Sequence, residues 1–250
     1  MRARVPIDPD TLMLWEPQAD DGTAIKIAGV PGKALGIETE LPIVSESNGM
    51  VTGRPVDTIS IDGKEIKVSI LSSGLPNIFV NPASLSLDAD ILTRPASYLT
   101  SHPTLPSLLE RIRVAVATEF SIPLSLASPK IILVGSVPPN GYVTTTGERA
   151  GAADLLVRAV SSGDFHATIP GSTLAATNLG AGIAGTLIAE LVGRTGDAGD
   201  ELVSVRAGHA AGVADSTARF ERGKCVSVVI MRTAREIMRG EIMVEERELL

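Results

Sequence analysis

A long run of small and apolar residues between Thr173 and Val192 constrains the fold more than any other part of this sequence. Glu190 is its only charged residue, so a helix formed by this run is apolar on every side. In a soluble chain such a helix must be buried on every side, which requires a sheet to wrap around it. Its three internal glycines each weaken a helix by about 1 kcal/mol relative to Ala, and close packing of strands would explain their presence.

Most segments around this helix are predicted strands, because they are alternating or short apolar runs bounded by turn residues. These runs are 24–30, 65–71, 77–80, 130–134, 202–206, 225–231 and 241–244. Helical spacing of apolar residues predicts helices over 108–120 and 152–160, with Arg113 of the first helix facing solvent. The sequence therefore predicts an α+β fold, in which an antiparallel sheet curves around a central apolar helix.

Charge and composition exclude several classes of protein. The net charge of −7 argues against a nucleic-acid-binding protein, which should carry a basic face. The single cysteine, Cys225, suits a reducing compartment, and its apolar surroundings predict a buried structural role. There is no run of about 18 apolar residues to span a membrane, and the N-terminus has no hydrophobic signal core. We therefore expect a cytoplasmic protein that binds neither nucleic acid nor membrane.

The first candidate site is the start of the apolar helix, which follows His166 in the sequence. Ser172 or Thr173 is a good N-cap residue. The first turn of a helix offers free N–H groups and a partial positive charge, and a carboxylate suits both. The alternative is an ordinary capped helix that binds no ligand.

Three further segments carry candidate binding or proton-transfer groups. His209, in a turn that precedes Gly212, is either a carboxylate ligand and proton carrier or a structural histidine. Arg232, between two predicted strands, is either a forked carboxylate ligand or a surface arginine. The segment Thr52-Gly53-Arg54 is either a turn that offers backbone N–H groups or a plain turn. The three histidines lack the spacing of a metal motif, so we expect no metal site.

The order of these segments resembles that of the PrpF family, whose members shift double bonds in small polycarboxylic acids. The most specific likeness lies in Gly208-His209-Ala210-Ala211-Gly212-Val213 and in the segment Arg232-Thr233-Ala234-Arg235-Glu236-Ile237-Met238. The segments 29–32, 52–57 and 67–70 follow in the family order upstream. The resemblance covers residues 24–244, which is most of the chain.

This resemblance implies the diaminopimelate-epimerase-like fold, in which two similar lobes each wrap a sheet around a central helix and the substrate lies between them. The helix over 173–192 would then be the central helix of the second lobe. On this reading residues 65–250 form the second lobe, and residues 1–64 are the remnant of a truncated first lobe.

The chemistry that the resemblance implies is a double-bond shift in a small unsaturated polycarboxylate, such as aconitate or methylitaconate, without a cofactor. A base removes an allylic proton, and an acid returns one at the other end of the allyl unit. His166 and His209 would then be catalytic. The implied substrate-binding residues are Thr52, Gly53, Arg54, Ser172, Thr173, Gly212 and Arg232.

The chain also departs from the family pattern, which leaves a second hypothesis open. The family's Gly-Thr-Ser-Lys-like loop, catalytic Lys and Cys-Gly-Asn turn have no counterpart here, and its His-Pro-Ser-Gly segment is His209-Ala210-Ala211-Gly212. The chain would then be a catalytically inactive relative that acts as a carboxylate-binding or interaction module. Because an incomplete lobe exposes apolar surface, we expect a homo-oligomer or a partner that supplies the missing lobe.

Overall fold

The computed structural model describes residues 1–5 and 24–234, and their strands form one large sheet. The strands are β1 (Arg2–Arg4), β2 (Ala24–Ile25), β3 (Ala34–Pro42), β4 (Asp57–Ile61), β5 (Lys64–Ser72), β6 (Pro76–Val80), β7 (Lys130–Gly135), β8 (Leu155–Ser161), β9 (Asp164–Phe165), β10 (Leu202–His209), β11 (Gly212–Glu221) and β12 (Lys224–Ala234). Their order is β1-β3-β12-β11-β10-β8-β7-β6-β5-β4, with β2 paired to β3 and β9 paired to β8. Only β6–β7 and β8–β10 are parallel pairs among these strands, so the expected α+β fold with a mainly antiparallel sheet is confirmed.

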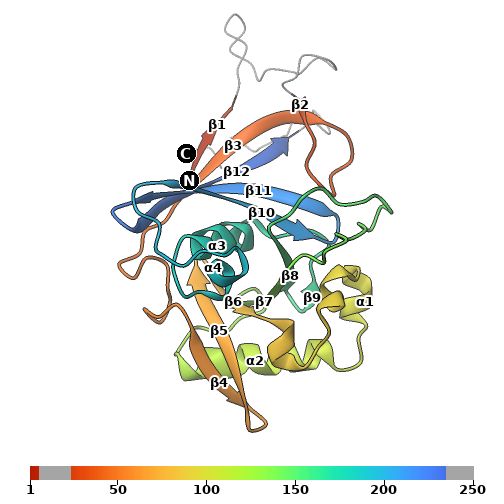
Figure 1. The fold of residues 1–250 in the computed structure, drawn as a ribbon, viewed down its shortest axis with the longest axis vertical. Coiled ribbons are helices and arrows are strands. Elements are labelled where there is room, and N and C mark those ends of the chain that lie inside the picture. Colours follow the sequence, from red (N-terminus) through yellow and green to blue (C-terminus); the bar gives the residue numbers. More distant parts are fainter. Residues whose placement is uncertain (6–23, 235–250) are drawn as a thin grey trace, which may run out of the picture.

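The helices of the described residues lie on both faces of this sheet. They are the 3-10 helices η1 (Pro82–Leu85) and η2 (Ala89–Thr93) and the α-helices α1 (Ala96–Thr100), α2 (Leu105–Glu119), α3 (Gly171–Ala181) and α4 (Leu187–Leu191). In Figure 1, α3 and α4 lie between strands β10–β12 above and strands β5–β8 below, while α2 lies against the lower strands from the outside. None of these helices is long and apolar enough to cross a membrane.

Helix α3 is enclosed by the curved sheet, as its sequence predicts. It packs against β5, β10, β11 and β12, and every residue from Thr173 to Ala181 is buried. Leu174 and Leu179 join Phe79, Val205 and Phe220 in one continuous core. Small side chains allow the strands to approach the helix: a β-carbon on Gly180 would lie 2.5 Å from the Leu71 side chain.

The apolar run is not one helix but two, which corrects the expected span of 173–192. Helix α3 ends at Ala181, and α4 begins at Leu187 after a turn. Gly182 lies against the Phe220 ring with no room for a side chain, and Gly185 has a positive φ of 79°. Thr186 then starts α4, because its side chain accepts a hydrogen bond from the Ala189 N–H. The break therefore has two causes: glycines weaken the end of the first helix, and the Thr186 side chain caps the start of the second.

A second core lies on the opposite face of β4–β8, under α2. Alternation along β7 divides its residues between the two cores: Ile132 and Val134 face α3, whereas Ile131 and Leu133 face α2. All four are at most 1% exposed. A strand buried on both faces reads as a continuous apolar run, which is why this segment is apolar throughout.

Two expectations for the α2 side of the sheet are wrong. The predicted helix over 152–160 is strand β8, since a run such as Leu155-Leu156-Val157 satisfies helical spacing and a strand buried on both faces equally well. Arg113 is buried rather than solvent-facing, because its guanidinium donates hydrogen bonds to the backbone carbonyls of Ser125, Ser128 and Pro129.

The other predicted strands are confirmed with longer or shorter bounds, and the long strands β3 and β11 are additions that the pattern did not reveal. The expected strand at 241–244 lies outside the described residues. Strands β3 and β4, from the first 64 residues, pair with β12 and β5. The division into lobes at residues 1–64 and 65–250 stays a prediction.

Candidate functional site

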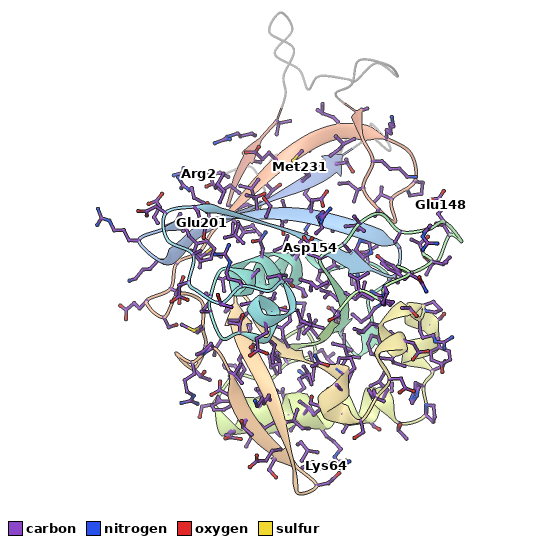
Figure 2. The ribbon with its side chains drawn as sticks, viewed as in Figure 1. Arg2, Lys64, Glu148, Asp154, Glu201 and Met231 are labelled. Carbon is purple, nitrogen blue, oxygen red and sulfur yellow. The ribbon has the colours of Figure 1, made fainter. Side chains whose placement is uncertain are left out.

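A cavity of about 310 Å³ lies beside the first turn of α3, and we call it the α3 pocket. Its walls come from five parts of the chain: the end of β2 with the segment that follows it, residues 168–169 before α3, Leu174 of α3, the adjoining ends of β10 and β11, and the end of β12. Figure 2 shows one lining residue, Met231, on β12. The polar lining residues are Lys26, Thr168, His209, Asp215 and Arg232.

Arg232 brings a guanidinium to the start of α3. It lies within β12, opposite Ile37 of β3, so its expected position between two strands is corrected. Alternation with Ile230, a core residue, turns its side chain toward α3. The guanidinium packs against Gly171, the first residue of the helix, so closely that a β-carbon there would overlap it. A cation and the first helical N–H groups therefore meet at one place, and both favour an anion.

The N-cap of α3 is Pro170, not Ser172 or Thr173 as the sequence suggested. The Thr173 side chain is fully buried, and its hydroxyl donates to the Asn77 side-chain oxygen over 2.8 Å. The half-buried Ser172 accepts a hydrogen bond through its carbonyl from the Ser73 hydroxyl. Neither hydroxyl caps the helix, because both residues already lie inside the first turn. The backbone N–H groups of that turn are the donors that remain for a ligand.

His209 is the most buried polar group of the α3 pocket, with 1% of its surface exposed. Its Nδ1 accepts a hydrogen bond from the Ala211 N–H over 3.2 Å, so the proton of the neutral ring resides on Nε2. Burial lowers the pKa of His209 to about 4, and the nearby charges of Arg158 and His166 lower the pKa in the same direction. The imidazole is therefore neutral at pH 7 and can donate through Nε2.

His166 lies close to His209, so the two predicted catalytic histidines share one end of α3. It follows β9, where its backbone N–H donates to the Ala159 carbonyl over 2.8 Å. Its Nδ1 accepts the Thr168 N–H over 3.1 Å and lies 3.2 Å from the Thr168 hydroxyl. These contacts leave Nε2 of the half-buried ring as the nitrogen that is available for proton transfer.

Gly212 shapes the pocket rather than supplying a side chain. It begins β11 with a φ of 145°, a conformation that favours glycine, and a β-carbon there would lie 2.6 Å from the Ala28 side chain. The close approach brings the segment 25–30 over the β10–β11 turn. Gly29 makes a similar approach, since its β-carbon would lie 2.6 Å from the Thr168 methyl group.

The turn Thr52-Gly53-Arg54 is not brought together with the α3 pocket. The Thr52 hydroxyl donates to the buried Asp57 carboxylate over 2.6 Å, and Arg54 forms an ion pair with the same carboxylate. The adjacent Pro55 lies against Gly185, which follows the end of α3. A helix of eleven residues is about 16 Å long, so this turn lies near the helix end opposite Gly171.

Sequence reasoning missed several groups that surround His209. Lys26, Thr168 and Asp215 line the pocket but lie in short segments without a recognisable motif. Arg158 could have been noticed, because it is a single cation within the apolar run of β8. Cys225, in contrast, is buried as expected, and burial raises the pKa of its thiol to about 12. Among residues 1–5 and 24–234, no group of His, Cys, Asp and Glu side chains could hold a metal ion.

Sequence comparisons with known proteins point to the PrpF family. A family model described as PrpF protein matches residues 15–245. The chain is 30% identical to 3-methylitaconate isomerase of Eubacterium barkeri over 96% of its own length and 66% of that protein. It is 29% identical to 2-methyl-aconitate isomerase of Shewanella oneidensis over 77% of its length and 50% of that protein. The chain therefore spans about half to two thirds of the curated relatives it matches.

A solved structure agrees with these sequence matches. The crystal structure of methylitaconate-delta-isomerase superposes with a TM-score of 0.79 at 27% identity, over 99% of this chain and 64% of the other. The large mainly antiparallel sheet around α3 thus corresponds to part of that enzyme's fold.

Proposed function

The chain belongs to the PrpF family, and from this premise we propose that its α3 pocket binds a small unsaturated polycarboxylate in a double-bond isomerisation. The reaction needs no cofactor in this proposal, because an allylic shift requires only removal and return of a proton. Relatives named for methylitaconate and 2-methylaconitate make these two acids the first substrates to test.

One observation carries the proposal: three kinds of hydrogen-bond donor that can bind a carboxylate lie together at the start of α3. Arg232 offers a forked guanidinium, the first turn of α3 offers backbone N–H groups, and His209 offers Nε2–H. The pocket volume of about 310 Å³ lies at the lower end of the range of small-molecule sites, which suits a small acid. Lys26 adds a second cation to the lining, whereas Asp215 would repel a carboxylate and so direct its orientation.

The roles of the two histidines differ in this mechanism. Removal of an allylic proton places negative charge on the conjugated carboxylate, and fixed donors stabilise that charge. His209 is a neutral donor suited to this task, because a pKa of about 4 makes it a weak base. His166 is the better group for the proton transfer itself, since its Nε2 makes no hydrogen bond within the described residues.

The second hypothesis, a carboxylate-binding relative without turnover, has one observation in its favour. The reaction requires both an acid and a base near the substrate. His166, which lies close to His209 but does not line the α3 pocket, is the single proton carrier that we assign. If the site has no second proton carrier, the expected behaviour is binding of the carboxylate without turnover.

Deuterium uptake tests the proposal. The protein is incubated in deuterium oxide with methylitaconate or 2-methylaconitate, and proton NMR follows the loss of allylic signals. We expect deuterium at both ends of the allyl unit and a shifted double bond. Binding of tricarballylate, a saturated tricarboxylate, is measured in parallel by calorimetry. Binding without uptake would establish the second hypothesis, and absence of both would refute the proposed function.

A matched pair of arginine variants locates the site. Arg232→Gln removes the guanidinium beside Gly171, and we expect about a tenfold to hundredfold loss of tricarballylate affinity. Arg219→Gln is the control, because Arg219 lies on β11 with its side chain paired to Glu40 and Glu221 outside the α3 pocket. Equal effects of the two substitutions would show a loss of general charge rather than of a binding contact.

A further inference from the structure

A buried arginine lies under the β10–β11 turn. Arg158, on β8, is 1% exposed and is the largest fully buried side chain of the described residues. Its strand neighbours Val157 and Ala159 face α3, so Arg158 points to the other face of the sheet. Its Nε and Nη2 have no hydrogen-bond partner among the described residues, and no carboxylate there pairs with it. A buried cation without a counter-ion opposes folding, so packing alone does not explain why an arginine occupies this position.

The guanidinium does make contacts, and they lead to His209. Its Nη1 donates to the Val157 carbonyl over 2.8 Å and to the Gly208 carbonyl over 3.2 Å. Gly208 directly precedes His209 in β10. One end of the His209 turn is therefore held by a buried, charged donor.

Tyr142 holds the other end of the same turn. Its hydroxyl donates to the Gly212 carbonyl, and its ring lies 5.8 Å from the Arg158 guanidinium carbon. Burial raises the pKa of Tyr142, so the hydroxyl keeps the proton that it donates. Gly208 leaves room for this arrangement, because a β-carbon there would lie 3.0 Å from the Tyr142 oxygen and 2.6 Å from Leu156.

We propose that Arg158 and Tyr142 are positioning residues of the α3 pocket, which hold the carbonyls of Gly208 and Gly212 and thereby fix the His209 imidazole as a neutral donor. Neither residue lines the pocket, so both act through the turn. The inference rests on the proposed function of His209 as a ligand for a carboxylate.

Electrostatics supports the same arrangement. Burial lowers the pKa of Arg158 to about 10, so the guanidinium stays charged at neutral pH. This charge, after burial itself, is the largest influence that keeps the pKa of His209 low. The other ionisable groups around the α3 pocket are His166 before α3, Lys26 after β2, Asp215 on β11 and Arg232 on β12.

The test is a titration of the histidines by NMR, which needs no ligand. The three histidines are labelled with nitrogen-15, and His209→Gln identifies the signal of interest by its absence. In the wild type we expect the Nε2–H form near neutral pH and a midpoint near pH 4. A midpoint near the ordinary value of about 6.5 would overturn the proposal without any variant.

Three variants separate positioning from packing. Arg158→Met removes the charge and should raise the His209 midpoint by about one pH unit, whereas Arg158→Lys should leave it near the wild-type value. Arg113→Met is the control, because Arg113 is another buried arginine, which lies on α2 and donates to carbonyls of the 125–129 loop rather than to the His209 turn. An unchanged midpoint in Arg158→Met, or an equal rise in Arg158→Lys, would overturn the proposal.

Tyr142→Phe keeps the charge and removes the donor to Gly212. It should leave the His209 midpoint low while the fraction of the Nε2–H form falls, since one end of the turn is released. An Nε2–H fraction equal to that of the wild type would overturn the role of Tyr142. Where Arg158→Met does not fold, Tyr142→Phe and the wild-type titration decide. Absence of both tricarballylate binding and deuterium uptake in the wild-type protein would refute the proposed function, and the histidine titrations, which need no ligand, would still decide the roles of Arg158 and Tyr142.

Discussion

Gly171→Ala should separate ligand binding from stability. Gly171 is the first residue of α3, and a β-carbon there would overlap the Arg232 guanidinium. The overlapping atoms are the far end of a flexible, exposed side chain, so Arg232 moves away at little conformational cost. Alanine is the better helix former by up to about 1 kcal/mol. We therefore expect unfolding free energy to stay equal or rise slightly, while the carboxylate site loses its guanidinium.

The loss of that charge-assisted contact is worth about 1.5–3 kcal/mol, or about tenfold to more than a hundredfold in affinity. Calorimetry with tricarballylate measures it, and urea unfolding measures stability. Gly180→Ala in the same helix is the control, because its β-carbon would lie 2.5 Å from Leu71 in the core. That variant should lose stability and keep its affinity per folded molecule. Wild-type affinity in Gly171→Ala would refute the joint binding of a carboxylate by Arg232 and the helix start.

Three further predictions concern the surroundings of the pocket. Gly212→Ala should lower the unfolding free energy by about 1–3 kcal/mol in urea titrations, because its φ is 145° and its β-carbon would lie 2.6 Å from Ala28; wild-type stability would contradict the close approach. The pKa of His209 is lower in the folded than in the unfolded state, so stability should be lost as pH falls from about 6.5 to about 4, by up to about 3 kcal/mol, and His209→Gln should remove this part of the pH dependence. Thr52→Val should weaken folding by about 1 kcal/mol through the lost bond to Asp57 but leave tricarballylate affinity unchanged; a loss of affinity would return Thr52 to the binding site.

The core of the fold could be predicted from the sequence because its signal is local. The run after Thr173 has almost no charge, and a helix of that composition is stable only inside a sheet. Its break at Gly182 could not be predicted, because the glycine is explained by the Phe220 ring, which comes from a distant strand. The sequence of β8 predicts a helix instead of a strand for a related reason: burial on both faces removes the alternation that identifies a strand.

The sequence indicates individual candidate residues of the site but not which of them lie together in the fold. His209 and Arg232 both line the α3 pocket, and His166 lies close to His209, whereas their roles in binding or catalysis stay predictions. The turn at Thr52 does not join them, because whether a turn's donors face a ligand or a neighbouring carboxylate depends on tertiary contacts. The charge of Arg158 is visible within the apolar run of β8, but its contact with Gly208 is tertiary, because it crosses between two strands.

A structure determined with tricarballylate bound would test the central claim most directly. The account predicts one carboxylate within hydrogen-bonding distance of both the Arg232 guanidinium and the first N–H groups of α3, with the His209 Nε2 directed at the ligand. A ligand bound outside the α3 pocket, or one that leaves Arg232 without a carboxylate partner, would contradict it.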